Sequence, residues 1–191
     1  SDGDIATAAT MLKKAGHEVA WLDGIAEEWS PETLSDRLAA FAPDVVVLET
    51  KTPVVKRHWA WIAAFKATHP ARAAKVVLVG DHVTALPDET MENCPVDYVL
   101  TGGDWDFLLL NLVSSGFDPA RFEPGIWHRG GNTGRFRLDH DLKTTPWIDR
   151  DLCRWRLYAY KNGNFRKTPG TYLMAGRDCW HAKCTFCSWT T

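Results

Sequence analysis

The sequence predicts an α/β fold with a parallel sheet, and three observations support this. Extended apolar runs alternate with amphipathic helical patterns over residues 5–115. The run at residues 44–50 is rich in β-branched side chains, which is typical of a strand buried on both faces. Polar and glycine-rich loops follow three of the runs. Strands that alternate with helices form parallel sheets with right-handed crossovers.

The individual elements follow from the same patterns. Gly16 is a suitable residue after the end of the first helix, and Ser30 and Pro31 form an N-cap followed by a proline in the first helical position. Glycines at residues 130–134 predict a turn between residues 126–128 and 135–138, within a hairpin over 125–138. We expect strands at residues 17–23, 44–50, 75–80 and 97–101, and helices at 5–15, 30–41, 54–68, 88–93 and 104–115.

Length and composition exclude several classes of protein. The chain has 191 residues, enough for one large domain or two small ones, with 24% charged and 45% hydrophobic residues. The net charge is −2 and no run of lysine and arginine stands out, so we expect no nucleic-acid partner. No apolar stretch approaches the roughly 20 residues that span a bilayer. Without a secretory signal, the expected location is cytoplasmic.

The loops after the expected strands are candidate ligand contacts, because ligands of parallel α/β sheets bind beyond the carboxyl ends of the strands. Glycine lets a backbone approach a ligand closely, and free N–H groups at helix starts can bind polar groups. Alternatively, these glycines only make tight turns. No dinucleotide-binding or phosphate-loop pattern is present. The candidate residues are Thr50 and Thr52, then Gly80, Asp81, His82 and Thr84, then Gly102, Gly103 and Asp104.

Three cysteines, Cys179, Cys184 and Cys187, lie within nine residues after an extended run at residues 170–175. Three thiolates could hold three irons of a [4Fe–4S] cluster and leave the fourth iron open. A structural zinc site with His181 as the fourth ligand is an alternative. With five cysteines in the chain and no secretory signal, disulfides are not expected. Positive charges beside the thiolates favour the cluster and come from Arg177, His181 and Lys183.

The cysteine motif resembles that of the radical S-adenosylmethionine (radical SAM) enzymes. Phe186 stands at the aromatic position just before the last cysteine of their motif, and the gap of two residues between Cys184 and Cys187 matches theirs. The first gap differs, because four residues separate Cys179 from Cys184 where their motif has three. The resemblance implies that S-adenosylmethionine binds the open iron and is cleaved reductively to a 5′-deoxyadenosyl radical. It also implies adenine contacts at the backbone near Phe186 and a partner that donates electrons.

Residues 4–115 resemble the cobalamin-binding domain that precedes the barrel in one class of these enzymes. The most specific pieces are residues 14–19, 43–47, 80–87 and 96–103. The resemblance implies a flavodoxin-like fold of five strands, of which the first is missing here, and cobalamin held by the loops at Thr50, Gly80 and Gly102. No histidine stands in an Asp-x-His-x-x-Gly motif. Cobalt would therefore lack a histidine ligand from the protein, with His82 beside the corrin or its tail.

Together these features predict three regions: a cobalamin-binding-like α/β domain at 1–118, a linker with the hairpin at 119–168, and the first strand and cluster loop of a radical SAM (β/α) barrel at 169–191. The linker contains Pro-x-Ile-Asp-Arg-Asp-Leu at 146–152, a phrase typical of such linkers. We expect a fragment, inactive alone, of a radical SAM enzyme with an unknown substrate. Its reaction is methyl transfer to an unactivated carbon or another radical reaction. The alternatives are a non-enzymatic metal-binding or ligand-sensing module with a structural zinc, and a flavodoxin-like scaffold without a ligand.

Overall fold

The computed structural model describes residues 3–68, 74–160, 165–171, 176–177, 179, 181 and 183–185. The chain forms two compact units. Unit 1 comprises Ser1–Arg37 with Asp141–Ala175, and unit 2 comprises Leu38–His140 with Gly176–Thr191. Within the described residues, no helix combines the length and apolar character needed to cross a membrane.

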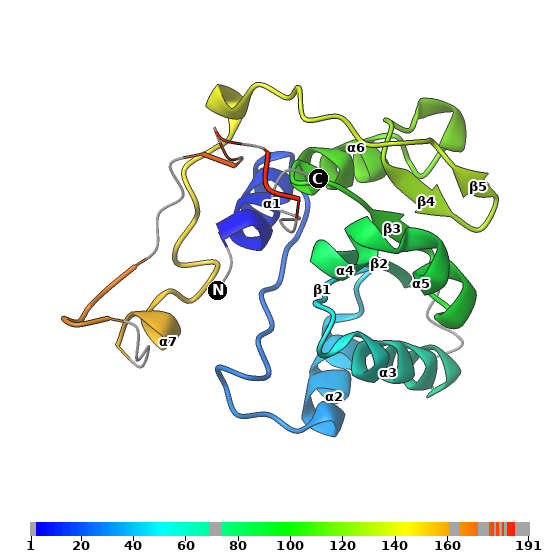
Figure 1. Cartoon of the computed structure of the whole chain (residues 1–191). Coiled ribbons are helices and arrows are strands. Elements are labelled where there is room, and N and C mark those ends of the chain that lie inside the picture. Colours follow the sequence, from blue (N-terminus) through cyan, green and yellow to red (C-terminus); the bar gives the residue numbers. More distant parts are fainter. Residues whose placement is uncertain are drawn as a thin grey trace. The chain divides into compact units, whose positions relative to one another are not determined.

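Unit 2 contains a five-stranded sheet in the order β1-β2-β3-β4-β5 (Figure 1). The first three strands are parallel, and β4 and β5 continue the sheet in antiparallel pairing. The mixed α/β class with a mainly parallel sheet is thus confirmed. The strands are β1 (Val45–Glu49), β2 (Lys75–Val79), β3 (Tyr98–Leu100), β4 (Ile126–His128) and β5 (Gly131–Asn132).

The helices of unit 2 follow the strands as the alternating pattern predicts. They are α3 (Val55–Thr68), α4 (Asp81–Ala85), α5 (Pro87–Asn93), α6 (Trp105–Ser114) and the 3₁₀ turn η1 (Pro119–Arg121). The core is formed around β2, where residues 76–79 have no exposed surface, and it includes Ile62, Leu100, Leu112 and Ile126. Burial of each such side chain contributes about 1.5–3 kcal/mol relative to exposure.

In unit 1, side-chain contacts join the N-terminal residues to the segment that begins at Asp141. Its helices are α1 (Gly3–Lys14), η2 (Leu142–Thr144) and α7 (Arg156–Ala159). Lys13 Nζ donates to Asp149 Oδ2 at 2.6 Å, and Arg154 forms an ion pair with Glu27. Helix α1 ends as predicted: Gly16 has φ 93°, its N–H donates to Lys13 O and the N–H of His17 donates to Leu12 O.

Helix α2 (Pro31–Phe41) also begins as predicted, although the division between the two units falls inside it. The Ser30 hydroxyl accepts a hydrogen bond from the Thr33 N–H at 3.2 Å, which satisfies one of the unpaired donors of the first turn. Pro31 occupies the first helical position, where its missing N–H costs nothing.

The predicted strand at residues 17–23 is wrong, because these residues have no strand conformation and lie in unit 1. In a flavodoxin-like order of 2-1-3-4-5, a strand after the first helix pairs only with the strand before that helix. Among the described residues no strand precedes α1, so residues 17–23 have no such neighbour there. Residues 17–23 are held instead by side chains, including a hydrogen bond of 2.9 Å from Trp21 Nε1 to Tyr158 Oη.

The hairpin is present but shorter than predicted. Its second strand is β5, which lies inside the predicted turn, and residues 135–138 form no strand. The turn is at Arg129 and Gly130, and Ile126 and Thr133 close the ladder with hydrogen bonds of 2.9 and 3.0 Å. Phe136 leaves the ladder and packs against Gly102 and Gly125. Helix α4, which follows β2 directly, was not predicted.

Candidate cofactor site at the carboxyl end of the sheet

The three predicted loops meet at one edge of the sheet in unit 2. Thr50 follows β1, and its N–H donates to the carbonyl of Val79, the last residue of β2, at 2.9 Å. The N–H of Gly102, in the loop after β3, donates to Thr84 Oγ1 in α4 at 3.1 Å. Each loop is therefore bonded to the next. The carboxyl ends of β1, β2 and β3 form one continuous edge, as the parallel arrangement requires.

His82 lies in the middle of this edge and is 6% exposed. Its Nδ1 pairs with Thr52 Oγ1 at 3.2 Å, and Trp59 packs edge-on against its ring at a centroid distance of 5.9 Å. Its Nε2 is buried without a hydrogen-bond partner, 3.6 Å from the Glu89 carboxylate of α5. Most buried polar atoms have a hydrogen-bond partner, either in the protein or in an ordered water, so the missing partner of this nitrogen requires an explanation such as a water or a ligand.

Gly80 and Gly102 are required by contacts within the protein. Gly80 has φ 113°, and a Cβ there would lie 2.4 Å from the carbonyl oxygen of Thr50. Gly102 has φ 87°, and a Cβ would lie 2.4 Å from the ring of Phe136. At Gly103 the nearest atom to a Cβ, in Leu138, is 3.7 Å away, an ordinary contact. The tight-turn interpretation therefore accounts for two of the three glycines.

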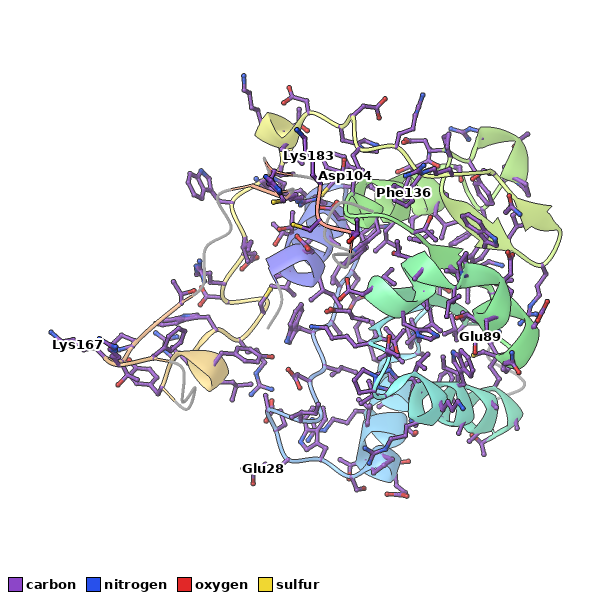
Figure 2. All side chains as sticks on the ribbon, in the orientation of Figure 1. Glu28, Glu89, Asp104, Phe136, Lys167 and Lys183 are labelled. Carbon is purple, nitrogen blue, oxygen red and sulfur yellow. The ribbon has the colours of Figure 1, made fainter. Side chains whose placement is uncertain are left out.

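Residues 134–140, here called the strap, run along the loop after β3. Phe136 packs on Gly102, Leu138 on Gly103, and His140 binds Asp104, so alternate strap residues contact successive loop residues. Figure 2 shows where Phe136 and Asp104 lie in unit 2. This arrangement differs from the predicted hairpin, in which residues 135–138 form the second strand. The alternation of Phe136, Leu138 and His140 was the available signal.

His140 fastens the end of the strap between two carboxylates. Its Nδ1 is 3.1 Å from Asp104 Oδ2, its Nε2 is 2.9 Å from Glu123 Oε2, and its ring stacks on Phe107 at 4.4 Å. Burial acts to lower the pKa of His140, but hydrogen bonds and charges from Glu123 and Asp104 outweigh burial and raise it. A protonated imidazole donates to both carboxylates at once.

The residues present fit cobalamin at the first two loops. Thr52 and Asp81 are exposed, and Thr84 is half-buried, so a carboxylate and two hydroxyls are available at the edge. These groups can bind the amide side chains of a corrin. The third loop differs: Gly102 and Asp104 are buried under the strap, and only Gly103 keeps partial exposure. The described structure therefore offers most of its polar contacts from the loops after β1 and β2.

The cysteine segment is described only in part. Cys179 is half-buried and Cys184 is exposed, both as free thiols, whereas Cys187 and Phe186 lie outside the described residues. Most of the extended run before Cys179 also lies outside them. In the described part of the chain, no three His, Cys, Asp or Glu side chains are grouped as a metal site. The cluster and zinc interpretations of this segment stay predictions.

The remaining two cysteines differ in their surroundings. Cys94 and Cys153 are 2% and 4% exposed. Burial raises the pKa of the Cys94 thiol, and burial with the nearby Asp149 carboxylate raises the pKa of Cys153 to about 11. A thiol with a raised pKa is a poor metal ligand, since metals bind the thiolate.

Comparison with known proteins points to one family. Residues 4–105, just over half of the chain, match the family model of the B12 binding domain. An uncharacterized methyltransferase of Pyrococcus horikoshii is 28% identical over 111 residues, which are 58% of this chain and 24% of that protein. The chain thus spans about a quarter of the length of this relative. No solved structure gives a significant match.

Proposed function

Since the chain belongs to the B12 binding domain family, we propose that it is the cobalamin-binding part of a cobalamin-dependent radical SAM enzyme that transfers methyl groups. One observation supports this most directly. The family match, the bonded loops at the sheet edge and the three-cysteine motif all occur in one chain, and the motif begins in the same compact unit as the loops.

The loops supply the proposed cobalamin contacts. Thr52, Asp81 and Thr84 present polar groups at the edge, and the backbone of Gly103 remains partly accessible. When bound, cobalamin supplies a cobalt centre that can carry a methyl group. His82 is oriented by Thr52 and Trp59. It would lie beside the cofactor and would not bind cobalt.

The cysteine segment supplies the second part. Cys179, Cys184 and Cys187 would hold a [4Fe–4S] cluster with one open iron, which binds S-adenosylmethionine and receives electrons from a partner. One feature favours this assignment: Cys179 and Cys184 are accessible free thiols. The similarity to a protein named as a methyltransferase favours methyl transfer as the reaction.

The cobalamin assignment is tested by titrating the chain with hydroxocobalamin and recording visible spectra. We expect saturable binding and a spectrum without histidine coordination from the protein. His82→Ala should weaken binding and leave the type of spectrum unchanged. A spectral shift that reports a changed cobalt ligand in His82→Ala would show that His82 binds cobalt, and absence of saturable binding would contradict the cobalamin assignment.

The cluster assignment is tested by anaerobic reconstitution with iron and sulfide. About four irons and four sulfides per chain are expected. Replacement of Cys179, Cys184 or Cys187 by alanine should abolish uptake, whereas Cys94→Ala and Cys153→Ala are matched controls because both thiols are buried. One zinc per chain and no iron would support the structural-zinc alternative. Equal loss of iron in all five variants would contradict the ligand set.

A further inference from the structure

A buried ion pair connects the cysteine segment to the first turn of α6. Asp106 has no exposed surface, and Arg177 donates to its two carboxylate oxygens at 2.7 and 2.6 Å. The N–H of Phe107 donates to the same carboxylate at 3.0 Å. A fully buried carboxylate requires a partner of this kind, because an unpaired charge in the interior is strongly unfavourable.

The position of Arg177 is defined from several sides. Its side chain is 13% exposed, one of its terminal nitrogens lies 3.7 Å from Asp104 Oδ1, and its guanidinium lies 5.9 Å from the ring centre of Phe107. The three partners, Asp104, Asp106 and Phe107, all lie at the start of α6. They follow Gly102 and Gly103 directly in the sequence. Two parallel N–H···O bonds fix the direction of a guanidinium as well as its distance, which a lysine could not do.

Arg177 is two residues before Cys179. Two extended residues span at most about 7 Å, so the Cα of Cys179 lies within that distance of the Cα of Arg177. The first cysteine of the motif is therefore tethered to the start of α6, which follows the loop after β3, through Arg177. This proximity comes from the ion pair, and nothing in the sequence motif itself specifies it.

We propose that Asp106 is a positioning residue: through Arg177 it holds the cysteine segment beside the cobalamin loops, so that the two metal cofactors lie close together. The inference rests on the proposed function, since it presupposes both cofactors. Asp106 itself touches neither of them. Its role would be to set the distance between a cluster held by the cysteines and cobalamin held by the loops.

The first experiment needs no cofactor. In a Cys179→Ser, Cys187→Ser background, nitroxide labels are placed at Cys184 and at Asp81→Cys, and the distance between them is measured by pulsed electron paramagnetic resonance. We expect one narrow distribution. Asp106→Asn and Arg177→Gln should each broaden it, and Arg177→Lys should restore it only in part. Lys66→Gln is the matched control, because it breaks the Lys66–Asp97 ion pair elsewhere in unit 2. A distribution unchanged by both variants overturns the proposal.

The second experiment uses the chain loaded with cob(II)alamin and a reduced cluster. In the unchanged chain, the cluster should accelerate the spin relaxation of cob(II)alamin several-fold. Asp106→Asn should lose this acceleration while iron, sulfide and cobalamin contents stay at those of the unchanged chain, a result that general destabilisation would not give. Full acceleration in Asp106→Asn overturns the proposal.

If the unchanged chain takes up no cluster, the proposed function fails, and the label distances still decide whether Asp106 anchors the segment. Arg177→Gln takes the place of Asp106→Asn in both experiments if the latter does not fold.

Discussion

Gly102 and Gly103 are neighbours in the loop after β3, yet they meet different constraints. Gly102 has a positive φ and contacts the Phe136 ring, whereas Gly103 has room for a methyl group. Gly102→Ala should therefore destabilise the chain by about 1–3 kcal/mol through backbone strain and displacement of Phe136. Gly103→Ala should change the free energy of unfolding by no more than about 0.5 kcal/mol. Urea unfolding measures both values.

The same pair separates a structural role from a ligand role. If cobalamin approaches the backbone at Gly103, Gly103→Ala weakens hydroxocobalamin binding although the protein remains stable. Equal affinity in Gly103→Ala and the unchanged chain would remove this residue from the cobalamin contacts. A large loss of stability in Gly103→Ala would instead contradict the packing described around Leu138.

At the scale of elements, the strap is held by a titratable group. The pKa of His140 lies above its usual value near 6.5, because Glu123 and Asp104 outweigh the effect of burial. The protonated ring therefore stabilises the fold fully below about pH 6.5, and this contribution disappears as the pH rises through the raised pKa. His140→Gln should cost about 1–2 kcal/mol at pH 6 and less at pH 8.5.

Urea unfolding of His140→Gln and the unchanged chain at both pH values measures this difference. His17→Gln is the control, since His17 is exposed and lies in unit 1. A loss of stability in His140→Gln that is the same at pH 6 and pH 8.5 would show that the charge of His140 is not what fastens the strap.

In unit 1, Tyr158 connects α7 to residues 17–23. Its hydroxyl accepts from Trp21 Nε1 at 2.9 Å and donates to Asp23 Oδ2 at 2.7 Å. Burial, followed by the hydrogen bond to Asp23, raises the pKa of Tyr158. Tyr158→Phe leaves both partners unsatisfied and should cost about 1–3 kcal/mol in thermal or urea unfolding. Tyr160→Phe, at a side chain that is 55% exposed, should cost almost nothing; equal effects would contradict this role.

The elements predicted from the sequence are those whose signals are local. Gly16 and Pro31 mark a helix end and a helix start, and the apolar runs of β1 and β2 identify buried strands. The errors concern pairing. Residues 17–23 have the pattern of a strand but pair with no strand among the residues that the structure describes, and Phe136 contacts a glycine 34 positions earlier in the chain. Such contacts depend on tertiary structure, which overrides local strand propensity.

The candidate site was predictable to a similar extent. Small and polar residues after parallel strands indicated the edge, and the structure joins those loops by hydrogen bonds. The importance of Asp106 was not visible, because a lone aspartate in the first turn of a helix is ordinary. Its partner Arg177 is 71 residues away, and the sequence indicates Arg177 only as a positive charge beside the cysteines.

At the scale of the whole molecule, the two compact units predict where cobalamin will act. The chain has its proposed contacts in unit 2 only, at residues 50–52, 80–84 and 102–104. Ligand binding to the folded state stabilises it by mass action, by about 2.7 kcal/mol at a free concentration of 100 times Kd. Hydrogen exchange of the full chain with saturating hydroxocobalamin should therefore slow at these three segments. Residues 150–160 of unit 1 should exchange as they do without ligand.

Protection at residues 150–160 and 165–171, with none at the three loops, would place the ligand in unit 1, where Arg150, Trp155 and Pro169 line a cavity of about 180 Å³. Protection at the first two loops without the third would mean that the strap stays closed over Gly102 when cobalamin binds.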